Sequence, residues 1–149
     1  MRIVKAGKAQ VGGIARLFDL YRHFYDCEPD LDAATAFIQA RYDGDESTLF
    51  AAVDDDDVLG FTQLYPSFCS VELMKIYILY DLYVDAPFRQ SGIGAALMDA
   101  AADWARANNA GRIDLLTAKD NITGQRLYER KGYEIANENF HAYSCYLDT

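Results

Sequence analysis

Apolar and polar residues in the first third of the chain recur with the period of helices. Residues 2–5 can form a short first strand, which is followed by apolar positions at helical spacing over residues 9–25 and again over residues 31–42. Asp30 or Asp32 can cap the second of these segments at its N-terminus. The pattern predicts one short strand and then two amphipathic helices.

The period then changes to that of strands. Residues 49–53 and 59–65 are apolar runs on either side of four consecutive aspartates at 54–57, which predicts a hairpin with an exposed acidic turn. No spaced ligand pattern of a calcium loop accompanies the aspartates, so we expect no metal there. Residues 73–84 are rich in Ile, Tyr, Leu and Val, and we expect them to form a central strand.

The last third alternates helix and strand signals. We expect an Ala-rich helix over residues 92–108, a strand over 112–118, a helix over 121–131 that Gly132 ends, and two final strands over 133–136 and 140–147. The pattern gives an α/β (α+β) class. A length of 149 residues with 51% apolar composition predicts one domain, residues 1–149.

Charge and cysteine content exclude several functions. The formal net charge of -9 argues against nucleic acid as a partner, because phosphate affinity is built from Lys and Arg contacts. No apolar run is long enough to cross a bilayer and no export segment is visible, so we expect no membrane partner and a cytoplasmic protein. Cys27, Cys69 and Cys145 are odd in number and widely spaced, which argues against a disulfide framework and a zinc site.

A glycine pair follows the predicted central strand. Arg89 precedes Ser91, Gly92 and Gly94, which open the next predicted helix, and free backbone N–H groups at such a helix start bind anions such as a pyrophosphate. A dinucleotide-binding fold would need a third small residue where Leu97 stands, and no Gly-Lys-Ser or Gly-Lys-Thr follows for a Walker-type loop. Glycines that only allow tight packing remain an alternative.

Two motifs carry a family resemblance. Residues 81–94, Asp-Leu-Tyr-Val-Asp-Ala-Pro-Phe-Arg-Gln-Ser-Gly-Ile-Gly, resemble the coenzyme A motif of the GNAT superfamily of N-acetyltransferases, and Asn121 with residues 127–133 resembles a second motif of the same family. The resemblance covers nearly the whole chain and is weakest before residue 45. It implies an acetyl-CoA-dependent N-acetyltransferase with a three-layer fold, whose mixed, mostly antiparallel sheet has about seven strands, with about four helices, and is splayed between the strands at 73–84 and 112–118.

The resemblance also implies a site. Backbone groups of Leu82, Tyr83 and Val84 would bind the pantetheine arm, Asn121 would contact the coenzyme near its reactive end, and the Tyr128 hydroxyl would face the sulfur. The pyrophosphate would be held by a run of seven residues: Arg89, Gln90, Ser91, Gly92, Ile93, Gly94 and Ala95.

An alkyl amine has about one part in a thousand of the reactive free base at neutral pH, so the reaction needs a base. Asp81, beside the implied thioester site, is the best candidate, and Glu72 at the other end of that strand is a weaker one. Asp81 would equally serve to anchor a cationic amine. Tyr128 would stabilise the departing thiolate by a hydrogen bond or by giving up its proton.

The acceptor is less well defined. Residues 79–84 are similar to the corresponding strand of diamine and polyamine acetyltransferases, except that Tyr80 replaces a glutamate. We expect a small cationic amine; the alternatives are a protein lysine or N-terminus, or a coenzyme-binding regulatory or partner module without catalysis. Relatives of this kind are often homodimers, which the edge of the last strands would suit. Aromatic or polar residues that would line a pocket or pack are Tyr21, His23, Tyr25, Tyr42, Tyr65, Tyr77 and Tyr80.

Overall fold

The computed structural model describes residues 1–147. Along the chain the elements are β1 (Arg2–Lys5), α1 (Lys8–Phe24), α2 (Leu31–Asp43), β2 (Thr48–Asp54), β3 (Asp57–Cys69), β4 (Met74–Val84), the 3-10 turn η1 (Ala86–Phe88), α3 (Ile93–Ala107), β5 (Ala110–Asp114) and α4 (Ile122–Arg130). The predicted order of the four helices and of the first five predicted strands is confirmed. Asp30 is the cap of α2, since its carboxylate accepts a hydrogen bond from the Ala33 N–H at 3.1 Å.

The five strands form one mixed sheet in the order β1-β2-β3-β4-β5. The pairs from β1 to β4 are antiparallel, and β5 runs parallel to β4. β4 therefore has a neighbour on each side, as expected of a long apolar strand. The four aspartates form the exposed turn between β2 and β3, where Asp54 pairs with Asp57, so the predicted hairpin is confirmed.

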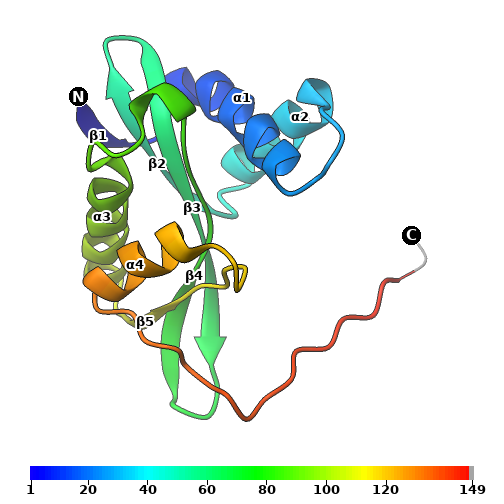
Figure 1. Ribbon diagram of the computed structural model, residues 1–149, viewed down its shortest axis with the longest axis vertical. Coiled ribbons are helices and arrows are strands. Elements are labelled where there is room, and N and C mark those ends of the chain that lie inside the picture. Colours follow the sequence, from blue (N-terminus) through cyan, green and yellow to red (C-terminus); the bar gives the residue numbers. More distant parts are fainter. Residues whose placement is uncertain (148–149) are drawn as a thin grey trace.

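Helices cover both faces of this sheet, which gives three layers (Figure 1). In β2, Leu49, Ala51 and Val53 face the core under α1 and α2, whereas Phe50 and Ala52 face the core under α3. Apolar residues on both faces explain why β2 reads as a continuous apolar run in the sequence. Among residues 1–147, no helix has the length and apolar character needed to span a membrane.

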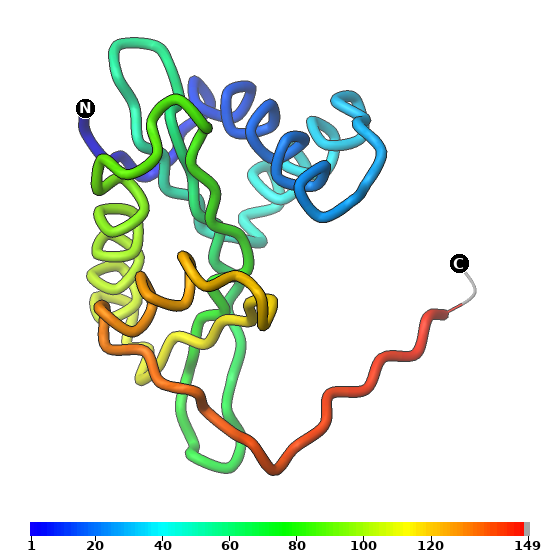
Figure 2. The backbone as a smooth tube through the Cα atoms, viewed as in Figure 1, coloured from blue at the N-terminus to red at the C-terminus, as the bar shows by residue number. Residues whose placement is uncertain are grey.

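The sheet is smaller than the expected seven strands. β5 ends at Asp114 instead of residue 118, and residues 115–118 leave the sheet as a loop. The expected strands at 133–136 and 140–147 are not strands in this structure, because a strand requires a partner backbone and neither segment pairs with any part of residues 1–147. Both lie in a C-terminal segment that runs away from the body of the molecule (Figure 2).

Candidate active site

A β-bulge in β4 determines where Asp81 points. Gln63 on β3 pairs with Asp81, but the next residue of β3 pairs with Leu79, which leaves Tyr80 without a partner. Because successive side chains alternate between the faces of a strand, one extra residue moves all later side chains to the opposite face. Leu79 packs in the core under α3, whereas Tyr83 packs in the core under α1 and α2. The bulge thus turns the Asp81 carboxylate towards α1.

The Asp81 carboxylate is buried and held by polar side chains. Asp81 is only 4% exposed, and its Oδ2 accepts a hydrogen bond from Gln63 Nε2 at 2.8 Å. Ser47 Oγ donates to Gln63 Oε1 at 2.7 Å, which orients the amide so that its N–H faces Asp81. Burial raises the pKa of Asp81, while hydrogen bonds from Gln63 and Tyr21 act in the opposite direction. A carboxylate shifted this way is suited to accept a proton near neutral pH.

Tyr21 on α1 lies beside the end of β4 that carries Asp81. Its hydroxyl donates to the Tyr80 carbonyl oxygen at 3.3 Å, and its ring centroid lies 5.1 Å from that of Tyr25. Burial raises the pKa of Tyr21, and the charge of Asp81 and the hydroxyls of Tyr25 and Tyr128 raise it further. Asp81 and Tyr128, the two residues predicted to be catalytic, therefore lie around one group of tyrosine hydroxyls, although they are 47 positions apart along the chain.

Tyr128 lies on α4 with its ring partly buried against the sheet. The ring centroid is 6.3 Å from that of Tyr133, and burial raises the pKa of the Tyr128 hydroxyl, with Tyr25 adding to the shift and Thr117 opposing it. A phenol with a raised pKa stays protonated and can donate a hydrogen bond. The Tyr128 ring therefore packs against the sheet, and its hydroxyl keeps the proton that a hydrogen-bond donor needs.

The sheet opens between β4 and β5. The two strands pair only at residues 75–78 of β4, so residues 79–84 have β3 on one side and no strand on the other within the described chain. The expected splay is thus present. One carbonyl at its end is engaged, because Arg89 Nε donates to Val84 O at 2.9 Å while the guanidinium lies 5.2 Å from the Tyr83 ring centroid. The Tyr80 carbonyl is also engaged, by the Tyr21 hydroxyl, and the other main-chain groups that do not pair with β3 are open to an extended ligand within the described chain.

The N-terminus of α3 follows directly after this edge. Its cap residue, Gly92, is left-handed (φ 85°, ψ 6°), and no side chain caps the helix. The first helical bond runs from the Ala96 N–H to Gly92 O at 3.0 Å, so the N–H groups of residues 93–95 precede the helical ladder. Gln90 also has a positive φ, of 63°. Unpaired amides at the positive end of a helix form an anion site.

The predicted loop residues differ in what they offer a ligand. Ile93 is 4% exposed and its side chain belongs to the core under α3, so only its backbone can bind. The Ser91 hydroxyl donates to the Phe88 carbonyl and so ties the loop to η1. At Gly94, an added Cβ would lie 3.2 Å from the Leu127 side chain, so this glycine also serves close packing of α3 against α4.

Comparison with known proteins identifies the family. The family model described as acetyltransferase (GNAT) family matches residues 14–133. This chain belongs to the GNAT family of acetyltransferases. It is 42% identical over 134 residues, 90% of each chain, to YhfO of Bacillus subtilis (strain 168), which is named an uncharacterized N-acetyltransferase. It is 27% identical over 136 residues, 91% of each chain, to a "probable acetyltransferase" of Haemophilus influenzae.

A solved structure supports the same assignment. The crystal structure of a protein described as a probable acetyltransferase superposes with a TM-score of 0.90 at 34% identity, over 100% of this chain and 99% of the other. The chain is therefore an enzyme of the acetyltransferase class, and GNAT acetyltransferases generally use acetyl-CoA.

Asn121 has a structural role in this GNAT chain. Its Oδ1 accepts from the Gly124 N–H at 3.2 Å and its Nδ2 donates to Thr117 Oγ1 at 3.1 Å, so it caps α4. An added Cβ at Gly124 would lie 2.4 Å from Asn121 Nδ2, which explains the glycine in the first turn. A direct contact between Asn121 and the coenzyme stays a prediction.

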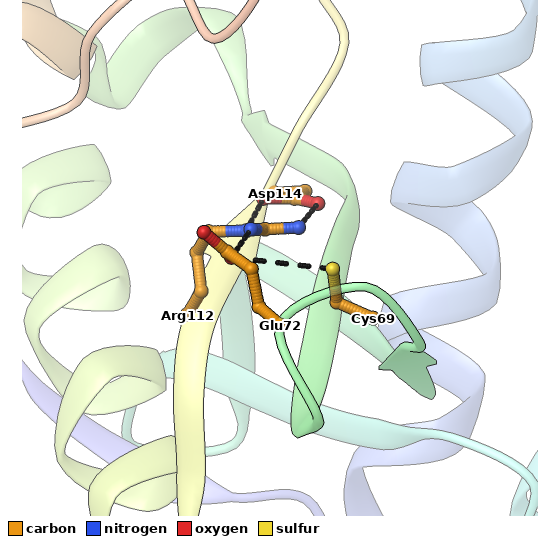
Figure 3. A network of polar contacts seen from close by, with 4 residues as sticks. All are labelled: Cys69, Glu72, Arg112 and Asp114. Atoms are coloured by element: carbon orange, nitrogen blue, oxygen red, sulfur yellow. Dashed lines mark hydrogen bonds and ion pairs between the residues drawn. The ribbon is translucent and has the colours of Figure 1, made fainter.

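Glu72, the weaker candidate for the base, belongs to a different network (Figure 3). Arg112 on β5 forms an ion pair with Glu72 in the β3–β4 turn and a second with Asp114, through Nε at 2.7 Å. Cys69 Sγ lies 4.0 Å from the Glu72 carboxylate. The side chains are exposed and lie at the end of β4 opposite Asp81, which leaves Glu72 a role in joining the hairpin to β5.

A pocket of about 470 Å³ lies between the C-terminal end of α1 and the loop before α4. Asp26 and Asp120 place two carboxylates in its wall, and Phe24 and Tyr25 provide ring faces. These are the groups that hold an ammonium ion. The other lining residues are Ala118, Asn121, Ile122 and Thr123. Tyr25 belongs both to this wall and to the tyrosines around Tyr21, so the pocket adjoins the predicted catalytic groups.

The aromatic residues considered for a pocket divide into two groups. Tyr65 and Tyr80 stack edge to face at 5.5 Å, and burial together with the Asp81 charge raises the pKa of Tyr65 to about 12, so both lie near Asp81. Tyr42 packs under α1, Tyr77 is buried under α3, and His23 Nδ1 lies 3.3 Å from the Cys27 carbonyl. Sequence reasoning missed Gln63, Ser47, Asp26 and Asp120, because no local motif surrounds them.

Proposed function

We propose that this GNAT enzyme transfers an acetyl group from acetyl-CoA to the primary amine of a small cationic molecule. The observation that carries the proposal is the open edge of β4: residues 79–84 lack a strand on one side, and the buried Asp81 carboxylate and the uncapped start of α3 lie at its two ends. An extended ligand on this edge would have an anion site at one end and a proton acceptor at the other.

The residues present fit a coenzyme A thioester. Its pyrophosphate is anionic, and the chain carries a net charge of -9, so capture requires a local positive site. The amides of residues 92–95, the left-handed Gly92 and the Arg89 guanidinium provide one. Backbone groups of Leu82, Tyr83 and Val84 offer hydrogen bonds to the amides of a pantetheine arm. Acetyl-CoA, when bound, supplies the thioester carbon that the amine attacks.

Two side chains would handle the protons. Asp81, whose pKa is raised by burial, accepts the proton that the ammonium group must lose before attack, either directly or through the adjacent Tyr21 hydroxyl. Tyr128 donates a hydrogen bond to the departing sulfur. A phenol with the ordinary pKa near 10 would lose about 2 kcal/mol in giving its proton to a thiolate whose thiol has a pKa near 8.5, and the raised pKa of Tyr128 adds to that cost, so the hydrogen bond is the larger part of its contribution.

The pocket beside Tyr25 supports a cationic acceptor. Tyr80 stands where diamine and polyamine acetyltransferases have a glutamate, but Asp26 and Asp120 supply carboxylates from other elements. A relative from Arabidopsis thaliana named L-ornithine N5-acetyltransferase is 26% identical over 86 residues, 58% of this chain and 38% of that protein. Its name places an amine of a diamino acid as its acceptor, which is the chemistry that two carboxylates and two ring faces would bind.

Calorimetric titration with coenzyme A tests the anion site. We expect saturable binding to the native chain and about tenfold weaker binding to Gly92→Ala, because a left-handed conformation costs an alanine roughly 1–2 kcal/mol. Gly7→Ala is the matched control, since an added Cβ there is 3.6 Å from Gln10 and far from the loop in the sequence. If titration of the native chain with coenzyme A gives no binding heat, the proposal is contradicted.

Release of free thiol from acetyl-CoA tests the acceptor class. We expect turnover with diamines, polyamines or diamino acids and much less with neutral monoamines of equal length. Turnover only with basic peptides would assign a protein lysine or N-terminus instead. Coenzyme binding without turnover on any amine would leave a coenzyme-binding module.

A further inference from the structure

The Tyr21 side chain lies over the end of β4 that carries Asp81. Its hydroxyl donates to the Tyr80 carbonyl oxygen at 3.3 Å, and its ring centroid is 6.1 Å from that of Tyr83. Tyr83 follows Asp81 by two positions on the same strand, so both side chains point to the face that α1 covers. Tyr21 therefore lies on the side of the sheet to which the Asp81 carboxylate is turned.

The Asp81 carboxylate is almost inaccessible to an amine that binds from solvent. Asp81 is 4% exposed, and its Oδ2 already accepts the hydrogen bond from Gln63. Tyr21 and Tyr65 lie beside it, and the charge of Asp81 raises the pKa of the hydroxyl on each. A proton that reaches Asp81 from a bound amine therefore needs a group that touches both.

Tyr21 also adjoins the pocket proposed for the acceptor. Its ring packs edge to face with that of Tyr25 at a centroid distance of 5.1 Å, and Tyr25 is 46% exposed and lines the pocket of about 470 Å³. The ring of Tyr65 packs instead against that of Tyr80. The Tyr21 hydroxyl is thus placed between a buried proton acceptor and the wall of the proposed amine site.

A phenol hydroxyl in this position can pass on a proton without becoming charged. It has one O–H donor and two acceptor lone pairs, so it can accept from an ammonium N–H while it donates to a carboxylate. Its bond to the Tyr80 carbonyl is longer than the usual O–H···O range of about 2.5–3.0 Å, so rotation of the hydroxyl towards Asp81 costs little. Burial and the Asp81 charge raise the pKa of Tyr21, so a free tyrosinate does not form and Asp81 keeps the proton.

We infer that Tyr21 is a catalytic residue that relays the proton from the acceptor ammonium to Asp81. An N–H bond of the ammonium breaks as the Tyr21 oxygen takes that proton, and the Tyr21 O–H bond breaks as its own proton passes to the Asp81 carboxylate. The ammonium becomes a neutral amine with a lone pair free for attack, the carboxylate becomes a carboxylic acid, and the phenol ends unchanged. This relay rests on the proposed acetyl transfer and replaces direct contact between the amine and Asp81.

Tyr21→Phe removes the hydroxyl and keeps the ring that packs against Phe61 and Tyr83. Thiol release is measured with the diamine, polyamine or diamino acid that the native chain turns over fastest. We expect kcat/KM to fall by about ten- to a hundredfold, less than the full effect of an acid–base group because a water molecule can partly replace the hydroxyl. Tyr42→Phe, a partly buried tyrosine of the same core, is the matched control and should stay within about twofold of native. A native kcat/KM for Tyr21→Phe overturns the relay.

Two further measurements separate a relay from a structural role. If Tyr21 acts only through Asp81, Tyr21→Phe should lower kcat/KM by no more than about twofold when Asp81→Asn is already present. The loss in the single variant should also shrink as pH rises towards the amine pKa of about 10.4, because more of the amine is then unprotonated. A loss that multiplies with that of Asp81→Asn, or one that is equal at every pH, overturns the relay.

Failure of the relay and failure of the proposed function give different results. Turnover by the native chain with no loss in Tyr21→Phe leaves the acetyl transfer intact and removes the relay alone. No turnover by the native chain with any amine removes both. Calorimetric titration with coenzyme A should give native affinity for Tyr21→Phe, and weakened binding that accounts for the lost activity also overturns the relay.

Discussion

The two ends of β4 carry acidic residues in opposite circumstances. Near its start, Glu72 is exposed, forms an ion pair with Arg112, and lies where β4 has a strand on both sides. Near its end, Asp81 is buried, has no ion-pair partner among residues 1–147, and lies where β4 has a strand on one side only. A carboxylate thus joins strands at one end of β4, whereas at the other end a buried carboxylate is the base that we propose.

The difference comes from pairing and burial together. A carboxylate that is hydrated and forms an exposed ion pair changes the free energy of unfolding little. A buried carboxylate loses its hydration, so its charged form is disfavoured unless a neighbouring group offsets that loss. Gln63 compensates only in part, because an amide N–H carries no net charge. Burial of the Asp81 carboxylate therefore costs stability, and groups perturbed in this way occur often at functional sites.

Asp81→Asn should separate the two ends most strongly. Loss of the base is expected to lower kcat/KM by about 10²- to 10⁴-fold, since the amide keeps the shape and still accepts from Gln63 but cannot take a proton. Glu72→Gln is the matched control and should leave kcat/KM within about twofold of the native value. Steady-state thiol release measures both, and equal loss in the two variants would refute the distinction.

Tyr128→Phe tests the proposed hydrogen-bond donor on α4. We expect kcat to fall by about ten- to a thousand-fold with little change in coenzyme affinity, because only the hydrogen bond to the departing sulfur is lost. Tyr133→Phe, an adjacent partly buried tyrosine, is the control and should be near native. An unchanged kcat for Tyr128→Phe would remove it from the mechanism.

Gln63→Met tests whether the hydrogen bond from Gln63 lowers the pKa of Asp81. The Gln63 hydrogen bond lowers the pKa of Asp81, so its removal should raise that pKa further. The base works only when ionised, and the acidic limb of the kcat/KM profile should therefore move to higher pH. A limb at the native position would show that Gln63 does not tune the base.

Asp81→Asn should also change how stability depends on pH. The folded-state pKa of Asp81 is raised above the unfolded value of about 3.9, so the native chain loses stability as pH rises from the unfolded to the folded pKa. The asparagine variant lacks this loss and should become the more stable of the two as pH rises. Urea unfolding at several pH values measures the difference, and a constant difference would contradict a raised pKa.

The smallest effect is expected at the exposed end of β4. Glu72→Gln should lower the free energy of unfolding by about 0–1 kcal/mol, because exposed ion pairs contribute little. High salt should reduce the difference, since the pair with Arg112 is screened. A loss that is large and independent of salt would mean that Glu72 is more deeply embedded than its exposure suggests.

The sequence predicted most of the fold because hydrophobic period and local signals agree over the first 110 residues. Asp30 caps the start of α2 and Gly132 follows the end of α4 as expected, and Gly132 has the left-handed φ, 89°, that its position requires. The loop that opens α3 was predictable for a similar reason, since Arg89, Gly92 and Gly94 all fall within residues 89–94. The last two strands could not be placed correctly, because pairing depends on a partner backbone and not on the apolar pattern itself.

Residues that reach the site only through tertiary contacts could not be predicted from the sequence. Gln63 and Ser47 are 18 and 34 positions before Asp81, as their numbers show, and nothing in their neighbourhoods marks a polar group as buried. Asp26 and Asp120 meet only because the end of α1 lies beside the loop before α4. The bulge at Tyr80 was equally hidden, since a single extra residue does not alter an apolar run.

That bulge has a consequence for how this stretch can vary in evolution. The number of residues between Ile78 and Asp81 determines which face of the sheet the later side chains of β4 occupy. Insertion or deletion of one residue would place the Asp81 carboxylate under α3 and a leucine towards α1. A substitution, such as Tyr80 in place of a glutamate, leaves the number of residues in this stretch unchanged. We therefore expect homologous chains to differ in side chains here while keeping the same number of residues.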